Sequence, residues 1–276
     1  MEGPAPVTST SSPASSPTTG SPAQPLLGKV ALVTGGSRGL GRAMVRGFAR
    51  AGADVVISSR KLDDCRALAE EVEREHGRRA FPHAAHVGHW DEVGALVEAA
   101  YAEFGRVDVL VNNAGLAPTY PGLDQVTEEL FDKVIGVNLK GPFRLTALVA
   151  TRMAAGAGGS IINISSSAAV RPMTTDLPYA AAKGGLNVLT AGFAQAFGPS
   201  VRVNTIMAGP FLTDMSRGWD MDALTGDLAH YPMRRAGDPD EVVGAAVYFA
   251  SDASSYTTGA VLPVDGGRGV VSFGSA

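Results

Sequence analysis

The residues with the clearest chemical use are a tyrosine and a lysine four positions apart, Tyr179 and Lys183. On a helix this spacing places both side chains on one face. A phenol near its reference pKa of about 10 is a poor base at neutral pH, but a nearby ammonium favours the phenolate and lowers that pKa. The pair is therefore suited to donate a proton to a carbonyl oxygen during a reduction and to accept it during an oxidation.

A serine at the end of an apolar run adds a second chemical group. Ser166 follows Ile161–Ile164, which is predicted to be a buried strand, and precedes Tyr179 by thirteen residues. A hydroxyl in this place could stabilise the oxygen whose charge develops in the reaction. Ser165 and Ser167 flank it, so the choice of Ser166 depends on spacing alone.

A glycine-rich loop, Thr34–Gly41, lies between a predicted strand and a predicted helix. Gly35 permits a tight turn, Gly39 lets the backbone approach a pyrophosphate, and Gly41 lets the helix pack on the sheet. The N-terminus of that helix favours negative charge through its free N–H groups and its dipole. This context indicates a dinucleotide phosphate site rather than an ordinary turn between a strand and a helix.

These groups belong to a chain in which short β-branched runs alternate with longer helical stretches. The predicted strands are Lys29–Thr34, Asp54–Ser58, Ala80–Val87, Val109–Asn112, Ser160–Ile164, Val201–Ile206 and Ala260–Val264, and the predicted helices are Gly39–Ala51, Leu62–His76, Asp91–Phe104, Thr127–Ala155, Tyr179–Phe197 and Pro239–Ser251. Strands that are apolar on both faces and separated by helices indicate a parallel sheet covered on both sides. The predicted fold class is α/β: one doubly wound Rossmann domain over residues 26–276, with a parallel sheet of about seven strands, helices on both faces, and a ligand crevice at the carboxyl ends of the strands.

The composition narrows the possible classes of protein. Of the 276 residues, 45% are hydrophobic and 18% are charged, as in soluble globular proteins that bury a full core. A net charge of −4 gives no reason to expect nucleic acid or an acidic membrane surface as a partner. The single cysteine, Cys65, excludes an internal disulfide and fits a reducing cytosol, so we expect a cytoplasmic protein.

The first 25 residues differ from the rest of the chain. Residues 1–25 are mostly Pro, Ser, Thr, Ala and Gly, with one acid and no base. Such a segment buries too little apolar surface to offset its ordering entropy, so we expect a disordered tail. It has neither the basic start and apolar run of a signal peptide nor the arginines of a mitochondrial presequence. No later stretch is long and apolar enough to span a membrane, so we expect no membrane association.

Together these motifs resemble the short-chain dehydrogenase/reductase family, in its 3-oxoacyl-reductase-like branch. The resemblance covers nearly everything after residue 26, and its motifs are T-G-x-x-x-G-x-G from Thr34, N-N-A-G from Asn112, the asparagine Asn138, Ser166 followed by Y-x-x-x-K from Tyr179, and V-D-G-G from Val264. It implies an oxidoreductase that moves a hydride between a nicotinamide cofactor and a small-molecule carbonyl or alcohol substrate.

The resemblance also assigns roles to residues. It implies a catalytic set of Asn138, Ser166, Tyr179 and Lys183, in which Asn138 holds a water that links Lys183 to solvent, and Lys183 binds the nicotinamide ribose. The implied cofactor contacts are Gly35, Ser37, Arg38, Gly39, Leu40, Gly41, Ser59, Arg60, Val87, Asn112, Ala114, Gly115, Tyr179, Lys183, Gly209 and Thr213. A homotetramer, or failing that a homodimer, is implied as well, with the stretches 127–155 and 179–197 packed across a two-fold axis.

The end of the second strand predicts which nicotinamide cofactor is bound. NAD-preferring proteins of this fold place an acid there, whereas this chain has Ser58, Ser59 and Arg60. Arg60 and the small Ser59 suit a 2′-phosphate, and Arg38 in the glycine loop supplies a second guanidinium. We therefore expect NADP(H) to be preferred, with NAD(H) possible.

The sequence departs from the family pattern at two places. Family members usually have Asp-Val after the third strand and Pro-Gly after the sixth, whereas this chain has His-Val at 86–87 and Ala-Gly at 208–209. His86 forms a spaced trio with His83 and His89, but on an extended segment successive histidines would point to opposite faces. We therefore predict no metal site.

The substrate side is the least defined by the sequence. Residues 211–235 correspond to the segment that forms a lid in the family, and its apolar residues are Phe211, Leu212, Met215, Trp219, Met221, Leu224 and Tyr231. These favour a partly apolar substrate, although they could equally pack on the core. No cluster of basic residues marks a site for a phosphate or a CoA tail. A ketone or a secondary alcohol is expected as the substrate. The alternative functions for the protein are a catalytically silent dinucleotide-binding regulator, an epimerase or dehydratase on the same scaffold, and an NAD-preferring alcohol dehydrogenase.

Overall fold

The computed structural model describes residues 24–214, 216 and 221–270. The predicted N-terminal tail therefore lies outside the described residues except for Gln24 and Pro25, and so do Met215 and Trp219 of the predicted lid. The chain joins the core at Leu26, which is fully buried and donates its backbone N–H to the carbonyl of Ala51. Within the described part, no helix combines the length and hydropathy needed to cross a bilayer.

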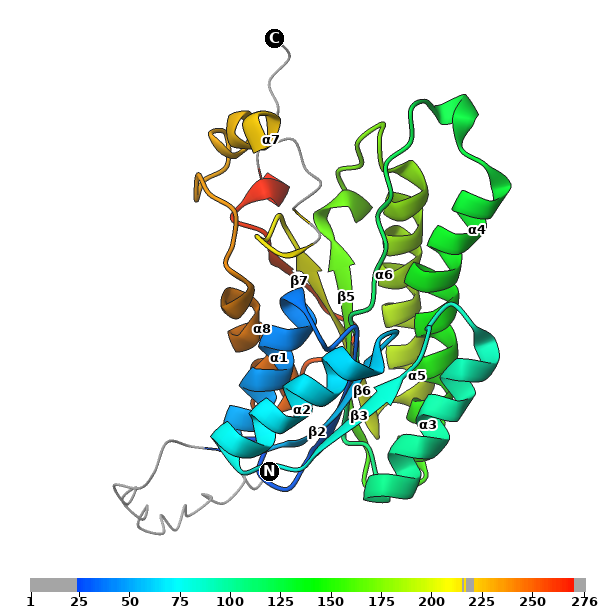
Figure 1. Cartoon of the computed structure of the whole chain (residues 1–276), viewed down its shortest axis with the longest axis vertical. Helices are drawn as coiled ribbons and strands as arrows, with labels where there is room; N and C mark the ends of the chain where they lie inside the picture. The colour runs from blue at the N-terminus through cyan, green and yellow to red at the C-terminus, as the bar shows by residue number, and fades with distance from the viewer. Residues whose placement is uncertain (1–23, 215, 217–220, 271–276) are drawn as a thin grey trace, which may run out of the picture.

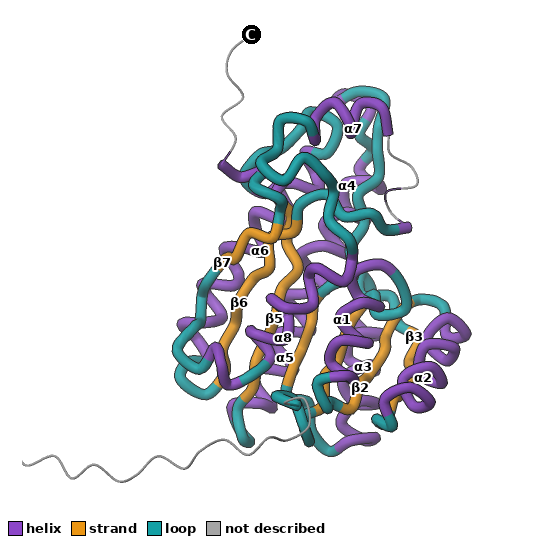
Figure 2. The backbone as a smooth tube through the Cα atoms, turned by 90° about the vertical axis from the view of Figure 1, so that its left-hand side faces the viewer, coloured by secondary structure: helices purple, strands orange, loops and turns teal. Residues whose placement is uncertain are grey.

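Seven parallel strands form one sheet, as predicted, in the order β3-β2-β1-β4-β5-β6-β7. They are β1 (Val30–Thr34), β2 (Asp54–Ser59), β3 (Ala80–Ala84), β4 (Val109–Asn112), β5 (Gly159–Ser166), β6 (Val201–Ala208) and β7 (Val261–Val264). Figure 2 shows them side by side, from β3 on the right to β7 on the left. The strand order reverses between β1 and β4, and ligands of such sheets bind outside the carboxyl ends of the strands at this reversal.

Helices cover both faces of the sheet (Figure 1). They are α1 (Gly39–Arg50), α2 (Leu62–His76), α3 (Trp90–Phe104), α4 (Glu128–Ile135), α5 (Gly141–Ala154), α6 (Leu177–Phe197), α7 (Met221–Leu228) and α8 (Val243–Ala250). Side chains alternate along β1: Ala31 and Val33 pack with α1, α2 and α8, whereas Val30 and Leu32 pack with α3 and α5. Both sets must be apolar because both faces are covered, which explains the unbroken apolar runs in the sequence.

Two helical features differ from the prediction. The sequence predicts one continuous helix over Thr127–Ala155, whereas the structure has α4, then a π-helical turn at Gly136–Lys140, then α5. Such a turn is the form in which π-helix usually occurs, within α-helices and often at functional sites. The second feature is α7, a short helix inside the predicted lid that the sequence pattern did not indicate.

Candidate active site

Tyr179 and Lys183 lie in the first two turns of α6, at the carboxyl end of β5. Pro178 occupies an early position of this helix, where its missing N–H costs nothing. The Lys183 Nζ lies 5.6 Å from the centroid of the Tyr179 ring, and it donates a 2.8 Å hydrogen bond to the carbonyl of Ile164 in β5. Lys183 is only 3% exposed, so the lysine is held between the helix and the strand.

The three consecutive serines at the end of β5 have different partners. Ser165 is buried and donates to the carbonyl of Lys183 at 3.2 Å. Ser167 accepts a hydrogen bond from Arg268 at 2.8 Å. Ser166 makes the side-chain hydrogen bond with Tyr179, and its Oγ also accepts from the N–H of Ala168 at 3.1 Å. Of the three serines, Ser166 is therefore the one that directly adjoins the phenol.

The protonation of this group differs from the expectation. The sequence predicts that Lys183 lowers the pKa of Tyr179, but burial raises that pKa; the hydrogen bond with Ser166 opposes the rise, and the charge of Asp176 adds to it. Burial also lowers the pKa of Lys183 to about 8. Spacing along a helix does not reveal how far each group is removed from water, and desolvation disfavours the charged form of either. At neutral pH the site therefore holds a phenol and an ammonium, which is the form that donates a proton.

The buried ammonium of Lys183 is expected to cost stability. Its pKa falls from its usual 10.5 to about 8, so the cost is full below pH 8 and disappears as the pH rises toward 10.5. That shift corresponds to a destabilisation of about 3 kcal/mol. Replacing the lysine removes this cost, but it also removes the hydrogen bond to Ile164, which stabilises the protein by about 1 kcal/mol. Lys183→Met is therefore expected to raise the free energy of unfolding by about 2 kcal/mol at pH 7. Urea unfolding at pH 7 and at pH 10 measures this, and a less stable variant at pH 7 would contradict it.

Asn138 lies within the π-helical turn and is fully buried. Its Nδ2 donates to the carbonyls of Leu116 at 2.8 Å and Val134 at 2.9 Å, and its Oδ1 accepts from the N–H of Leu116 at 3.2 Å. A methyl group added at Gly115 would stand 3.3 Å from Asn138 Oδ1 and 3.8 Å from Lys183 Nζ. The turn therefore lets Asn138 hold the segment after β4 beside Lys183, where a side chain at position 115 would be tightly packed.

The glycine loop fits a dinucleotide phosphate. Gly35 and Gly39 have positive φ of 61° and 52°, and a methyl group on Gly41 would stand 2.1 Å from the carbonyl oxygen of Gly35. Side chains are thus excluded where the loop turns onto α1. Arg38 occupies the N-cap of α1 in an extended conformation and makes no side-chain capping hydrogen bond, so the helix N-terminus is not closed by its own cap.

The segment after β4 is fixed to this loop. The hydroxyl of Thr34 accepts from the N–H groups of Asn113 and Ala114 at 3.1 and 3.2 Å and donates to the carbonyl of Val111. The Asn113 amide donates in return to the carbonyls of Thr34 and Gly35. The N-N-A-G motif is therefore explained structurally, because it joins the ends of β1 and β4 at the point where the strand order reverses.

Asn112, the first residue of that motif, turns its side chain away from the loop. It is 2% exposed and donates to Thr146 of α5 at 2.9 Å and to Asn163 of β5 at 2.8 Å. Asn163 continues the network to Thr190 of α6 at 2.8 Å. The side chain of Asn112 thus connects two strands to a covering helix. A cofactor could therefore be contacted at this position only by the backbone of Asn112.

The ends of β2 and β3 bring together the residues expected to contact the adenosine end of the cofactor. Ser37 donates to Ser59 at 3.0 Å, and Ser59 Oγ lies 3.1 Å from the buried Cys65 Sγ. Arg38 and Arg60 are exposed. Burial lowers the pKa of His86, and the charges of His89 and Arg60 lower it further, so Arg60 lies close to the end of β3. The pairing of β2 with β3 thus brings Arg60 near His86 at the ends of neighbouring strands.

The remaining expected contacts are placed at the same edge of the sheet. Val87 is buried beside the π-helical turn. Gly209 follows β6 and donates its N–H to the carbonyl of Val264, so close to Asp265 that a side chain would collide with it. Thr213 faces Gly39 across the glycine loop, since a methyl group at Gly39 would lie 3.4 Å from the Thr213 side chain.

The sequence and the fold of this chain are similar to those of known proteins. Residues 35–268 match a family model described as enoyl-(acyl carrier protein) reductase. Over 250 residues, 88% of this chain and 97% of the relative, the chain is 40% identical to the L-rhamnose 1-dehydrogenase (NAD(P)(+)) of Azotobacter vinelandii. Over 243 residues, 88% of this chain and 98% of the relative, it is 37% identical to a 3-oxoacyl-[acyl-carrier-protein] reductase of Thermotoga maritima. A solved short-chain type dehydrogenase/reductase of Mycobacterium marinum is 30% identical, with a TM-score of 0.81 over 88% of this chain and 96% of that one.

The chain belongs to the short-chain dehydrogenase/reductase family. The resemblance noted in the sequence is therefore confirmed, as is the class of activity: an NAD(P)-dependent oxidoreductase acting on a CH–OH/C=O pair.

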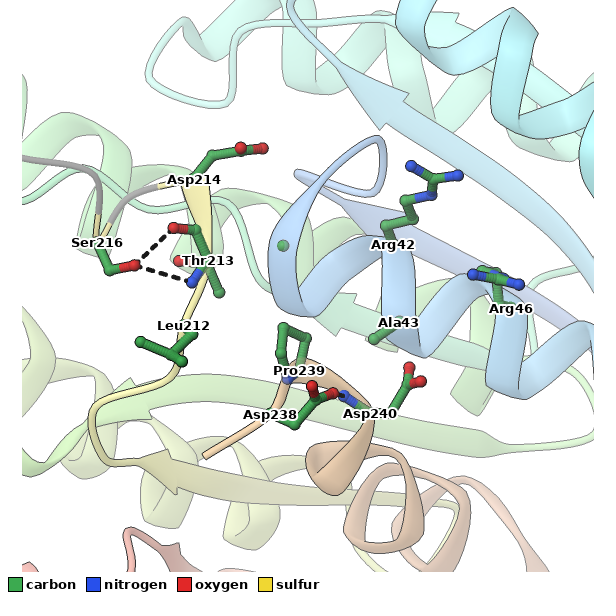
Figure 3. Close-up of a pocket in the computed structure, with 11 residues that line it drawn as sticks. Arg42, Ala43, Arg46, Leu212, Thr213, Asp214, Ser216, Asp238, Pro239 and Asp240 are labelled. Carbon is green, nitrogen blue, oxygen red and sulfur yellow. Dashed lines mark hydrogen bonds between the residues drawn. The ribbon is translucent and has the colours of Figure 1, made fainter. Parts of the chain in front are cut away.

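One cavity in this short-chain dehydrogenase/reductase lies outside the catalytic group. It has a volume of about 590 Å³ and is bounded by α1, by residues 212–214 and 216, and by Asp238–Asp240 (Figure 3). Its two arginines are already engaged: Arg42 and Arg46 pair with Glu71 of α2 at 2.6 and 3.1 Å. Tyr179, Lys183 and Ser166 do not line it. Of the residues expected to contact the cofactor, only Gly39 and Thr213 line this cavity.

A second cavity of the enzyme is lined in part by two arginines. It has a volume of about 300 Å³ and is lined by Arg171, Pro172, Met173, Asp227, Tyr231 and Arg268. The two arginines are far apart in the sequence, and the fold brings them together. Tyr231, expected either in a lid or in the core, is 4% exposed and borders this cavity, whereas Phe211 is buried in the core and Leu212 is 51% exposed.

The histidines of this dehydrogenase do not form a metal site in the described part of the chain. His86 and His89 stack with ring centroids 4.2 Å apart, and His89 bonds to Glu92. Over the described ranges, no group of three or more His, Cys, Asp or Glu side chains is arranged to hold a metal ion.

Proposed function

We propose that this chain is an NADP(H)-dependent oxidoreductase that interconverts a ketone and a secondary alcohol, with Tyr179 as the general acid and base. The observation that carries the proposal is the grouping of three polar side chains at the end of β5. Tyr179 is hydrogen-bonded to Ser166, and the Lys183 ammonium lies beneath the same ring, 5.6 Å from its centroid. These residues lie where a parallel sheet of this topology binds its ligands.

The chain's own residues would act on the substrate oxygen. In the reduction direction, the Tyr179 phenol donates its proton to the carbonyl oxygen as negative charge develops there. Ser166 donates a hydrogen bond to the same oxygen and stabilises that charge. Lys183 keeps a positive charge below the phenol and stabilises the phenolate that remains. In the oxidation direction, the phenolate accepts the proton of the alcohol.

The cofactor would lie across the ends of β1, β4 and β2. When bound, it supplies the hydride for the carbonyl carbon or accepts one from the alcohol carbon. Its pyrophosphate would meet the N–H groups of the glycine loop, and Lys183 would bind the ribose nearest the reacting carbon. Arg38 and Arg60 would bind the 2′-phosphate, since both guanidinium groups are exposed at the end of the second strand, which carries no acid.

We also propose that the protein is cytoplasmic and assembles as a homotetramer or homodimer through α5 and α6. These helices expose apolar side chains: Phe143 is 41% exposed and Val188 is 72% exposed. The ring of Phe143 lies 5.6 Å from that of Phe193, so apolar side chains of α5 and α6 adjoin each other. A free, buried Cys65 is compatible with a reducing compartment.

A titration of the purified protein with NADPH and with NADH tests the proposed function. Quenching of protein fluorescence gives both dissociation constants, and NADPH is expected to bind at least about tenfold more tightly because of its charged 2′-phosphate contacts. Consumption of NADPH in a screen of carbonyl compounds then tests catalysis. Tighter binding of NADH would overturn the choice of cofactor, and binding without any turnover would support the silent regulator instead.

A further inference from the structure

The second cavity is linked to the catalytic group through Arg268, which lines it and donates to Ser167, the neighbour of Ser166. Its walls come from parts that are distant in the sequence. One wall belongs to the segment 167–176, which connects Ser166 to the start of α6, and another to Tyr231 after α7. The third is the short helix Arg268–Val270, drawn in red beneath α7 in Figure 1. A substrate that reacts at Tyr179 and extends past Ser167 would therefore reach this cavity.

Hydrogen bonds hold the two arginines of the cavity in place. Arg268 donates to Ser167 at 2.8 Å and is hydrogen-bonded to the Tyr231 phenol. Arg171 donates to the carbonyl of Gly269 at 3.0 Å, which closes the short helix onto the 167–176 segment. The Nε of Arg268 is buried and has no hydrogen-bond partner among the described residues. A buried donor without a partner is unusual and favours a ligand that accepts hydrogen bonds.

Carboxylates balance the positive charge of these arginines. Asp227 lines the cavity itself. Asp176 is near enough to Arg268 for their charges to interact, and its carboxylate accepts from the N–H of Met173 at 2.9 Å. Asp265, three residues before Arg268 in the chain, accepts from the N–H groups of Gly267 and Gly269 at 2.9 and 2.7 Å. With three carboxylates around two guanidinium groups, an added anion gains little here, whereas a neutral group that both donates and accepts hydrogen bonds finds partners of both kinds.

We propose that this cavity binds hydroxyl groups of the substrate, so that the enzyme acts on a neutral polyhydroxylated alcohol, such as a polyol or an aldose, and on the corresponding carbonyl compound. This inference rests on the proposed function, because it places the reacting carbon at Tyr179. In oxidation, the C–H bond of that carbon breaks and its electron pair passes as hydride to NADP⁺, while the hydroxyl proton passes to the Tyr179 phenolate. The neighbouring hydroxyls accept from Arg171 and Arg268 and donate to Asp227.

Steady-state oxidation with NADP⁺ tests the inference on compounds that differ in their hydroxyl groups. The panel contains tetritols, hexitols and aldoses, compared with sec-butanol and cyclohexanol. For the wild type, kcat/KM for the best polyhydroxylated substrate is expected to exceed that for sec-butanol by about 100-fold or more, because a site built for hydroxyls rejects an analogue that lacks them. Reduction of a 3-oxoacyl thioester with NADPH is measured in parallel.

Variants show whether the cavity causes this preference. Arg171→Met and Tyr231→Phe each remove hydrogen-bonding groups, and each is expected to lower the ratio of kcat/KM between the best polyol and sec-butanol by about tenfold. The matched control is Arg74→Met, which removes an exposed arginine of α2 and is expected to leave the ratio unchanged. Melting temperatures separate a loss of binding from a loss of folding, and Tyr231→Phe keeps the ring and its packing.

The outcomes distinguish this inference from the proposed function. Turnover of sec-butanol, cyclohexanol or the thioester in preference to every polyol would overturn the inference and leave the oxidoreductase in place. An equal loss of activity toward the best polyol and toward sec-butanol in Arg171→Met and Tyr231→Phe, at unchanged melting temperature, would also overturn the inference. No binding of NADPH and no turnover of any compound would overturn both.

Discussion

Replacing Tyr179 with phenylalanine is expected to lower kcat by about 1,000-fold or more and to leave the dissociation constant of NADPH almost unchanged. The variant removes one oxygen and keeps the ring, so the cation beneath the ring and the packing of α6 persist. Ser166 and Lys183 are not expected to replace the phenol, because the serine hydroxyl is a much weaker acid and the lysine is buried with one N–H bound to the carbonyl of Ile164. Turnover with the best carbonyl substrate and fluorescence titration with NADPH measure the two quantities.

The chain offers a matched control for this variant. Tyr256→Phe removes the same hydroxyl from a fully exposed side chain and is expected to change neither turnover nor cofactor binding. Retained turnover in Tyr179→Phe would assign the proton transfer to another group. A large loss of NADPH affinity would instead show that the phenol mainly supports the binding of the cofactor.

The architecture could be predicted because each of its causes is local in the sequence. Strands such as Val109–Asn112 and helices such as Leu62–His76 have the predicted bounds, since apolar runs end at turn residues and the apolar spacing of the helix ends at Gly77, whose φ of 60° stops it. The N-N-A-G motif and the glycine loop meet in the structure because the ends of adjacent parallel strands share an edge.

The interruption of the long helix at Asn138 could not be predicted in the same way. A π turn at Gly136–Lys140 leaves the apolar residues on either side in a helical pattern, so the sequence there is compatible with a continuous α-helix. The turn is favoured by tertiary bonds, above all those from Asn138 to Leu116, which lies more than twenty residues away. The sequence identified the asparagine only through its family resemblance.

The protonation of Tyr179 and the cluster around Arg268 were missed for a related reason. Both depend on burial and on contacts between distant segments: Arg268 meets Ser167, and Arg171 meets Gly269, each across about one hundred residues. The sequence shows Arg171 and Arg268 as isolated basic residues. The family resemblance gave no signal for them, because its closing motif ends at Gly267, directly before Arg268.

Replacing Arg60 with alanine is expected to raise the dissociation constant of NADPH by about 10- to 100-fold and that of NADH by less than about threefold. NADPH differs from NADH in its 2′-phosphate, and a guanidinium binds phosphate oxygens through charge-assisted hydrogen bonds that are stronger than neutral ones. Arg60 is exposed at the end of β2, and its charge reaches His86 at the end of β3. Titration of wild type and variant with both cofactors measures the difference.

The double variant of Arg38 and Arg60 shows whether the two guanidinium groups act on one phosphate. If they do, Arg38→Ala with Arg60→Ala is expected to bind NADPH and NADH with equal affinity, since the residues left at the end of β2 are uncharged serines, Ser58 and Ser59. Arg74→Ala is the control for a general loss of positive charge, because that arginine lies at the far end of α2. A preference for NADPH that survives in the double variant would place the phosphate on other groups, and His86 would then be the next residue to replace.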